Sequence, residues 1–98
     1  MSKQQELNGH KVCKALGDPT RVRILQCLVQ AYPDTLTITD LGNSLPDGLS
    51  PTTVSFHLRK LREAGLVKSA GHKRGFLALE KALSIRFNGE GVRVEEVE

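Results

Sequence analysis

The feature that most constrains the fold is the segment at residues 50–64, which has the start, the end and the apolar spacing of a helix. Ser50 followed by Pro51 is typical of a helix N-terminus, because the hydroxyl accepts a bond from a free backbone N–H and proline suits the first turn. Gly65 is a typical stop. Apolar residues recur at helical steps in between, at Val54, Leu58 and Leu61. We therefore predict a helix that packs on a core through this stripe.

Two further helices are predicted before this segment, from apolar residues that recur every three or four positions. These residues are Leu7, Val12, Leu16, Val22, Leu25, Leu28 and Val29. The Gly-Asp-Pro sequence at 17–19 ends a first helix over about 1–16. It also starts a second helix, which Asp18 caps and which runs to about Ala31.

A third, short helix is expected over 37–45, with Thr37 or Thr39 as its N-cap. The Pro-Asp-Gly sequence at 46–48 is typical of a turn. The short helix and the helix over 50–64 are therefore expected to form a pair joined by a tight turn.

Beyond residue 65 the sequence has strand patterns. Residues 66–70 and 76–80 flank the sequence GHKRG at 71–75, which predicts a hairpin with a basic tip. Residues 83–95 alternate between apolar and polar on either side of an Asn-Gly-Glu-Gly turn, which predicts a second hairpin. A short helix over 81–87 is the competing interpretation.

The chain of 98 residues is too short for two independent cores. A helical domain of this size often completes its burial by dimerising, so we expect a homodimer. No stretch has the apolar length of a membrane span, and the first residues lack the apolar centre of a signal peptide. A cytoplasmic protein with no membrane partner is therefore expected.

Positive charge is concentrated in residues 50–75, which hold six Lys or Arg against one acidic residue, although the whole chain carries a formal charge of only +3. Such a stretch suits a polyanion such as nucleic acid. An ordinary solvated face of lysine and arginine side chains is the alternative interpretation.

The exposed side of the helix over 50–64 has the chemistry of a DNA-contacting surface. A short helix, a tight turn and a second helix with a small polar face form the arrangement by which a helix enters the major groove. Base-contacting candidates lie opposite the apolar stripe, at Thr52, Ser55, Phe56 and Arg59. Hydroxyls bond to base edges, arginine engages guanine through two bonds, and phenylalanine touches the thymine methyl group. Double-stranded DNA is the expected partner.

Other polar residues are expected to contact the DNA backbone. On the flanks of the helix these are Thr53, Lys60 and Arg62. At the hairpin tip His72, Lys73 and Arg74 would reach the adjacent minor groove or backbone. An ordinary charged hairpin is the alternative for the tip.

Two segments, CKALGDPTRVRILQCL and LSPTTVSFHLRKLREAGLV, carry motifs of a known family. The first is similar to ALxDPTRxxIL and the second to VSxHLxxLxxAGLV, both found in the ArsR/SmtB winged helix-turn-helix repressors. The resemblance covers roughly residues 12–80. It implies that Asp18 through Arg21 begin the second helix, that Ser50 through Arg59 contact DNA, and that His57 is a satisfied packing residue behind the recognition helix.

The resemblance and the patterns together predict a mainly α-helical fold with a β-hairpin wing, a winged helix-turn-helix with an additional C-terminal β-hairpin. We expect a single domain over 1–98. Within it, about 1–16 form a dimerisation helix, 37–64 the helix-turn-helix, 66–80 the wing and 81–98 the C-terminal tail.

Two metal sites of the family are missing from the matching positions. Many members have a CVCDL-like cysteine pair where this chain has TITDL at 37–41, and threonine hydroxyls are poor ligands for soft metals. The tail after Glu80 lacks the histidines of the other site. Cys27 is expected to pack as a small hydrophobe. Cys13, with His10 three residues before it, is the remaining candidate for a metal or redox role.

The sequence therefore predicts a dimeric repressor that binds a palindromic operator. The helix over 50–64 would lie in the major groove and the wing tip at 71–75 on the flanking backbone or minor groove. The alternatives are a protein–protein interaction module without specific DNA binding, and a thiol-based redox or metal sensor that uses Cys13. An enzyme and a cofactor are not expected, because no catalytic triad, phosphate loop or paired carboxylate motif is visible. The sequence identifies no inducer.

Overall fold

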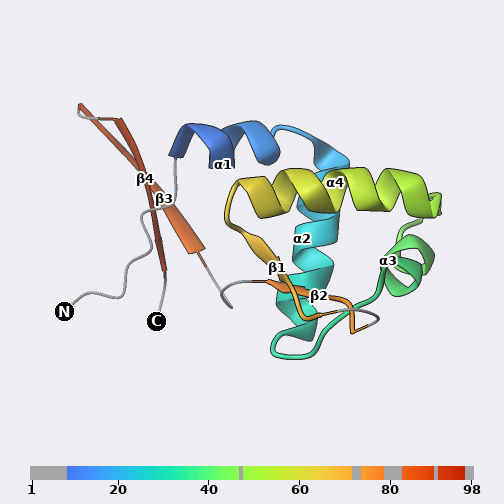
Figure 1. The fold of residues 1–98 in the computed structure, drawn as a ribbon. Helices are drawn as coiled ribbons and strands as arrows, with labels where there is room; N and C mark the ends of the chain where they lie inside the picture. Colours follow the sequence, from blue (N-terminus) through green and yellow to red (C-terminus); the bar gives the residue numbers. More distant parts are fainter. Residues whose placement is uncertain (1–8, 47, 72–73, 79–82, 90, 97–98) are drawn as a thin grey trace.

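The computed structural model describes residues 9–46, 48–71, 74–78, 83–89 and 91–96 of the chain. Within these ranges the helices are α1 (Gly9–Ala15), α2 (Pro19–Ala31), α3 (Ile38–Ser44) and α4 (Pro51–Glu63). The strands are β1 (Val67–Ser69), β2 (Phe76–Ala78), β3 (Leu83–Asn88) and β4 (Gly91–Glu96). Helices α3 and α4 with the β1–β2 hairpin form a winged helix-turn-helix, and β3 and β4 form an additional hairpin (Figure 1). The predicted fold class is confirmed.

The core draws on every helix, and the predicted stripe of α4 is part of it. Val54, Leu58 and Leu61 are at most 1% exposed. Equally buried residues from elsewhere in the chain pack in the same core: Val12, Ile24, Leu28, Leu41 and Leu66. Burying one side chain of this size contributes about 1.5–3 kcal/mol. Helix α4 is therefore fixed in the molecule through one face.

The two helices of the helix-turn-helix, α3 and α4, begin at capping residues that the sequence predicts. Ser50 caps α4, and its hydroxyl accepts a hydrogen bond of 3.2 Å from the backbone N–H of Thr53. Helix α3 is capped by Thr37 and not by Thr39. The Thr37 hydroxyl accepts from the N–H of Asp40, and the Asp40 carboxylate accepts from the N–H of Thr37, both at 3.0 Å. Hydrogen bonds with the backbone and side chain of Thr37 hold the pKa of Asp40 below its ordinary value.

The β1–β2 hairpin is the wing, and Leu36 joins it to the helices. Gly65, at φ 81°, ends α4 as predicted and leads into β1. Strands β1 and β2 pair antiparallel, with Lys68 opposite Leu77. The N–H of Leu36 donates to the carbonyl of Phe76 at 2.9 Å, and the N–H of Phe76 donates back at 2.8 Å. Leu36, the residue before the N-cap of α3, thus pairs with the wing, and the sequence did not predict this pairing.

The first helix is present as α1, in which Val12 and Ala15 are buried. The rest of the predicted helix over 1–16 includes residues 1–8, which lie outside the described part of the chain. Among the described helices, none combines the length and the apolar character needed to cross a membrane.

The C-terminal tail forms the predicted hairpin, so the competing helix is wrong for residues 83–87. Strands β3 and β4 pair antiparallel, with Ile85 opposite Val94 and Phe87 opposite Val92. The alternation of apolar and polar residues with a period of two favours strands over a helix here. Strand β4 lies beside α1 (Figure 1).

Gly75 is the wing position at which an added side chain has least room. Its φ is 92°, and an added Cβ would lie 2.5 Å from the carbonyl oxygen of Leu36. We expect Gly75→Ala to lower the free energy of unfolding by about 1–3 kcal/mol in urea denaturation, because backbone strain and the contact both act.

Gly71→Ala is the matched control for this substitution. Its φ is 113°, but the nearest atom to an added Cβ is Cδ of Arg74 at 3.8 Å, so it carries the backbone strain without a backbone contact. We expect a smaller loss for Gly71→Ala. Equal losses in the two variants would contradict a special role for the contact with Leu36.

Candidate nucleic-acid interface

Helix α4 turns one face to the core and the opposite face to solvent. The predicted base-contacting residues Thr52, Ser55, Phe56 and Arg59 are all exposed. Phe56 is 43% exposed, which is unusual among the large apolar side chains that the structure describes. The structure therefore places the four candidates on the outer side of the helix.

These four side chains share one shallow hollow of about 520 Å³. Its lining also includes Pro51, from the first turn of α4, and Ile38, from the first turn of α3. Pro51 lies within the range Ser50 through Arg59 that the family resemblance implies, although it is not one of the predicted base-contacting residues. The sequence prediction missed Ile38, because its position depends on how α3 packs against α4, for which the sequence carries no local signal.

Phe56 holds two cations beside this surface. The guanidinium carbon of Arg59 lies 5.6 Å from the centre of the Phe56 ring, and Nζ of Lys60 lies 5.5 Å from it. Cation–π contacts at exposed sites contribute about 0.5–1 kcal/mol each. The exposed ring therefore orients positive charge along the outer face of α4.

Ser50 and Thr53 are partly used by the helix itself. Their hydroxyl oxygens lie 3.0 Å apart, and the Ser50 hydroxyl also accepts from the N–H of Thr53. This arrangement fixes the first turn of α4, where backbone N–H groups and the helix dipole favour an anion. Both residues thus lie at the end of α4 that suits a phosphate, although their hydroxyls already have partners in each other.

The remaining predicted contact residues lie on α4 and on the wing. Arg62 is exposed on α4, and Arg74 is exposed at the wing tip. His72 and Lys73 lie outside the described residues. Lys68 on β1 is also exposed, and the sequence prediction did not include it.

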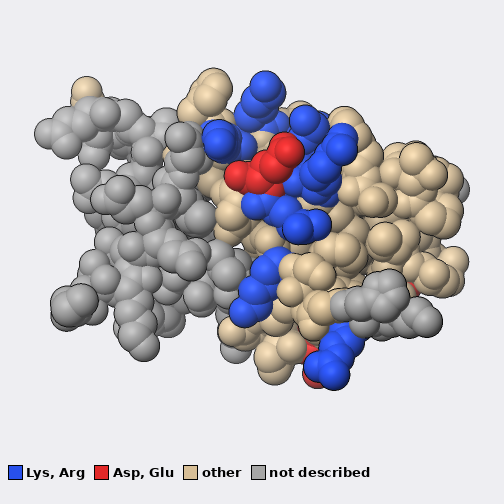
Figure 2. Space-filling model, in the orientation of Figure 1, with Lys and Arg blue, Asp and Glu red and all other residues tan. Residues whose placement is uncertain are grey.

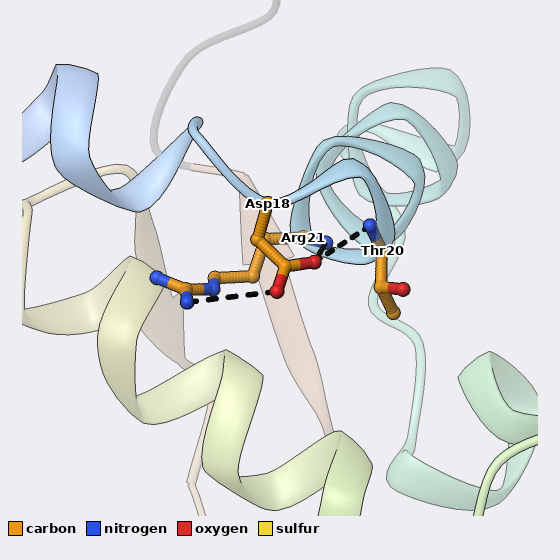
Figure 3. Close-up of polar contacts among 3 residues, drawn as sticks. All are labelled: Asp18, Thr20 and Arg21. Atoms are coloured by element: carbon orange, nitrogen blue, oxygen red, sulfur yellow. Dashed lines mark hydrogen bonds and ion pairs between the residues drawn. The ribbon is translucent and has the colours of Figure 1, made fainter.

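Asp18 lies where the start of α2 meets α4 (Figure 3). One carboxylate oxygen accepts hydrogen bonds from the backbone N–H of Thr20 at 2.8 Å and of Arg21 at 3.3 Å, and the other lies 3.7 Å from the Arg21 guanidinium. Burial raises the pKa of Asp18. The hydrogen bonds from Arg21 and Thr20 and the charges of His57 and Arg21 lower it by more, so the pKa lies below its ordinary value.

His57 packs behind the outer face of α4, as the family resemblance implies. It is 9% exposed, and its ring contacts the Phe56 ring edge-on with the centroids 5.5 Å apart. The expectation that it is satisfied is wrong at one atom: within the described part of the chain, its buried Nδ1 makes no hydrogen bond. Packing, rather than hydrogen bonding of Nδ1, therefore holds this ring in place.

The two cysteines occupy different environments. Cys27 is half-buried and packs against the core, in line with its predicted role as a small hydrophobe. Cys13 is exposed on α1. Among the described residues, no group of three or more His, Cys, Asp or Glu side chains is arranged to hold a metal ion.

A comparison with family models supports the arrangement of helices described above. A model described as a helix-turn-helix domain matches residues 16–70, more than half of the chain. The match extends from the end of α1 to the first strand of the wing and includes the whole of α4. Among curated proteins, no match was found.

The Asp18 cap provides a test of how α2 is joined to this region. We expect Asp18→Ala to lower the free energy of unfolding by about 1 kcal/mol at pH 7, because two backbone N–H groups lose their acceptor. Asp18→Asn should retain most of the stability, since asparagine is also a good N-cap. Chemical denaturation of the three proteins measures both effects.

The depressed pKa of Asp18 predicts the direction of a pH dependence. The pKa of Asp18 is lower in the folded than in the unfolded chain. The stability that its ionised carboxylate contributes is therefore fully present above the unfolded pKa of about 3.9 and is lost as the pH falls through the folded pKa. The difference in stability between the wild type and Asp18→Asn should therefore shrink below about pH 4. A difference that grows on acidification would contradict this account.

Proposed function

Because the chain belongs to the helix-turn-helix domain family, whose members are DNA-binding regulators, we propose that it is a dimeric transcriptional repressor of the ArsR/SmtB type. It acts in the cytoplasm on a palindromic operator. The observation that carries the proposal is the outer face of α4, where hydroxyls, an arginine and an exposed aromatic ring share one hollow. These groups match the donors, acceptors and methyl groups that base edges present in the major groove.

In the proposed complex α4 lies in the major groove. Arg59 bonds to guanine through two N–H groups, Thr52 and Ser55 bond to base edges, and Phe56 contacts a thymine methyl group. Since the Arg59 guanidinium lies 5.6 Å from the centre of the Phe56 ring in the free protein, the two side chains are already positioned relative to one another. Less ordering is then required on binding.

Phosphate contacts surround this helix in the proposal. On α4 and its first turn they come from Ser50, Thr53, Lys60 and Arg62. The wing tip adds Arg74, with His72 and Lys73 proposed from the sequence alone. These contacts set the register of the helix on the duplex, whereas the base contacts select the sequence.

The dimer is proposed to form through α1 and the C-terminal hairpin. Strand β4 lies beside α1, and the facing pairs of β3 and β4 include Ile85 with Val94 and Phe87 with Val92. A two-stranded hairpin is marginal alone in water, so cover by the domain or by a second copy stabilises it. Two copies would place two α4 helices on half-sites about 34 Å apart.

Binding to the DNA upstream of the chain's own gene, measured by fluorescence anisotropy at two salt concentrations, tests the proposal. Specific binding exceeds binding to a random duplex and persists at the higher salt, whereas non-specific binding is mostly electrostatic and falls steeply. Failure to prefer this upstream duplex over random DNA would favour the protein–protein interaction module instead.

Arg59 is expected to carry sequence preference. Arg59→Ala should weaken operator binding by about 1–3 kcal/mol and relax the preference at one base pair, because a groove-facing arginine reads guanine. Arg74→Ala is the comparison: it should weaken operator and random duplexes alike and reduce the salt slope by about one. If both variants lose affinity equally for operator and random DNA, the assignment of the base-contacting face is wrong.

Removal of the C-terminal hairpin tests its proposed place in the dimer. Deleting residues 82–98 should lower stability or dimerisation, and with it operator affinity, because a monomer engages only one half-site. Deleting residues 97–98 alone, which leaves β4 intact, is the control. Analytical ultracentrifugation measures the outcome. A truncated chain that remains a stable dimer with unchanged operator affinity would leave α1 as the dimer element.

A further inference from the structure

A second hollow lies between α1, the start of α2 and the end of α4, outside the base-contacting face. Its volume is about 430 Å³, within the size range of small-ligand sites. The lining residues are Lys11, Lys14, Ala15, Arg21, Lys60, Glu63 and Ala64. Helices that are far apart in the sequence thus bring cationic side chains to one place.

The charge of this hollow is strongly positive. Four of its side chains are cationic and one, Glu63, is acidic. Figure 2 shows lysine and arginine side chains gathered around an acidic one on the face over α1 and the end of α4. Glu63 lies 3.8 Å from Nζ of Lys60, so its charge is directed mainly at one of the four cations. Arg21 is in turn paired with Asp18, which is not among the lining residues.

Arg21 is the least exposed of these cations. It comes from the start of α2 and reaches toward the space between α1 and α4 (Figure 3). Its side chain is 16% exposed, and one guanidinium nitrogen lies 3.7 Å from Asp18. Its Nε is buried and makes no hydrogen bond within the described part of the chain.

The hollow is continuous with the base-contacting face through Lys60. This side chain lines the hollow and also lies over the Phe56 ring. A duplex held by the outer face of α4 therefore brings its backbone toward the hollow. Lysine and arginine side chains together favour phosphate, because arginine presents paired N–H groups and lysine a concentrated charge.

We propose that this hollow is a phosphate-binding site that holds a DNA backbone phosphate beside the major-groove contact. Its use by DNA rests on the proposed function, whereas its affinity for phosphate does not. Lys14 and Arg21 contact the phosphate, Lys60 links it to the groove-facing surface, and Glu63 limits the affinity. The site extends the DNA footprint from α4 to α1. Helix α1 contributes no residue to the predicted interface.

Lys14→Gln tests the site, because Lys14 is exposed and takes no part in the proposed base contacts. The variant should bind operator and random duplexes about fivefold more weakly at 0.15 M salt, with the salt slope reduced by about 0.9, as expected for one lost phosphate contact. Arg23→Gln removes the same charge from an exposed position of α2 outside the hollow and should change neither quantity. Glu63→Gln should strengthen binding to every duplex.

Titration of the DNA-free protein with pyrophosphate, followed by NMR, separates a DNA phosphate from a free one. Shift changes centred on Lys14, Arg21 and Lys60 that are lost in Lys14→Gln support a phosphate site. If the wild type binds no duplex, the proposed function fails, and these shift changes alone decide whether the hollow binds phosphate. If DNA binds but Lys14→Gln and Arg23→Gln have the wild-type salt slope, the hollow does not hold a DNA phosphate. If pyrophosphate also causes no shift changes, the hollow is not a phosphate-binding site.

Discussion

The burial of one stripe of α4 determines which of its side chains the molecule can present. Val54, Leu58 and Leu61 are held in the core, and this fixes the rotation of the helix about its own axis. A helix turned by a third of a revolution would bury Arg59 or expose Leu58, at a cost of several kcal/mol. The direction in which the outer face of α4 points is therefore fixed, although none of the side chains on that face is itself strongly held by the core.

The wing is positioned relative to this face by its packing against α2 and α4 and by one backbone pairing. Leu36 and Phe76 exchange two hydrogen bonds, and Gly75 permits the approach because it has no Cβ. Leu36 also precedes Thr37, whose capping box starts α3. The same short segment thus connects the wing to the first helix of the helix-turn-helix, so that the wing tip and α4 are positioned together.

Local patterns were sufficient to predict the helices, both hairpins and the outer face of α4. Capping residues and apolar periodicity act within a few residues, so they can be recognised in a single sequence. The pairing of Leu36 with Phe76 could not be predicted, since the two residues lie far apart and neither has a distinctive neighbour. The sequence also indicated both Thr37 and Thr39 as caps, and the two hydrogen bonds that Thr37 exchanges with Asp40 distinguish them.

The basic hollow illustrates a limit of charge counting along a chain. Lys11, Lys14 and Arg21 belong to the half of the sequence in which five basic and five acidic residues balance, so that half gave no sign of an anion site. Folding brings Lys14 and Arg21 together with Lys60 in the lining of the hollow, although Arg21 also pairs with Asp18. A neutral segment and a basic segment thereby form one positive surface. The charge that matters for a polyanion is the charge of that surface, and it arises from the packing of α1 against α4.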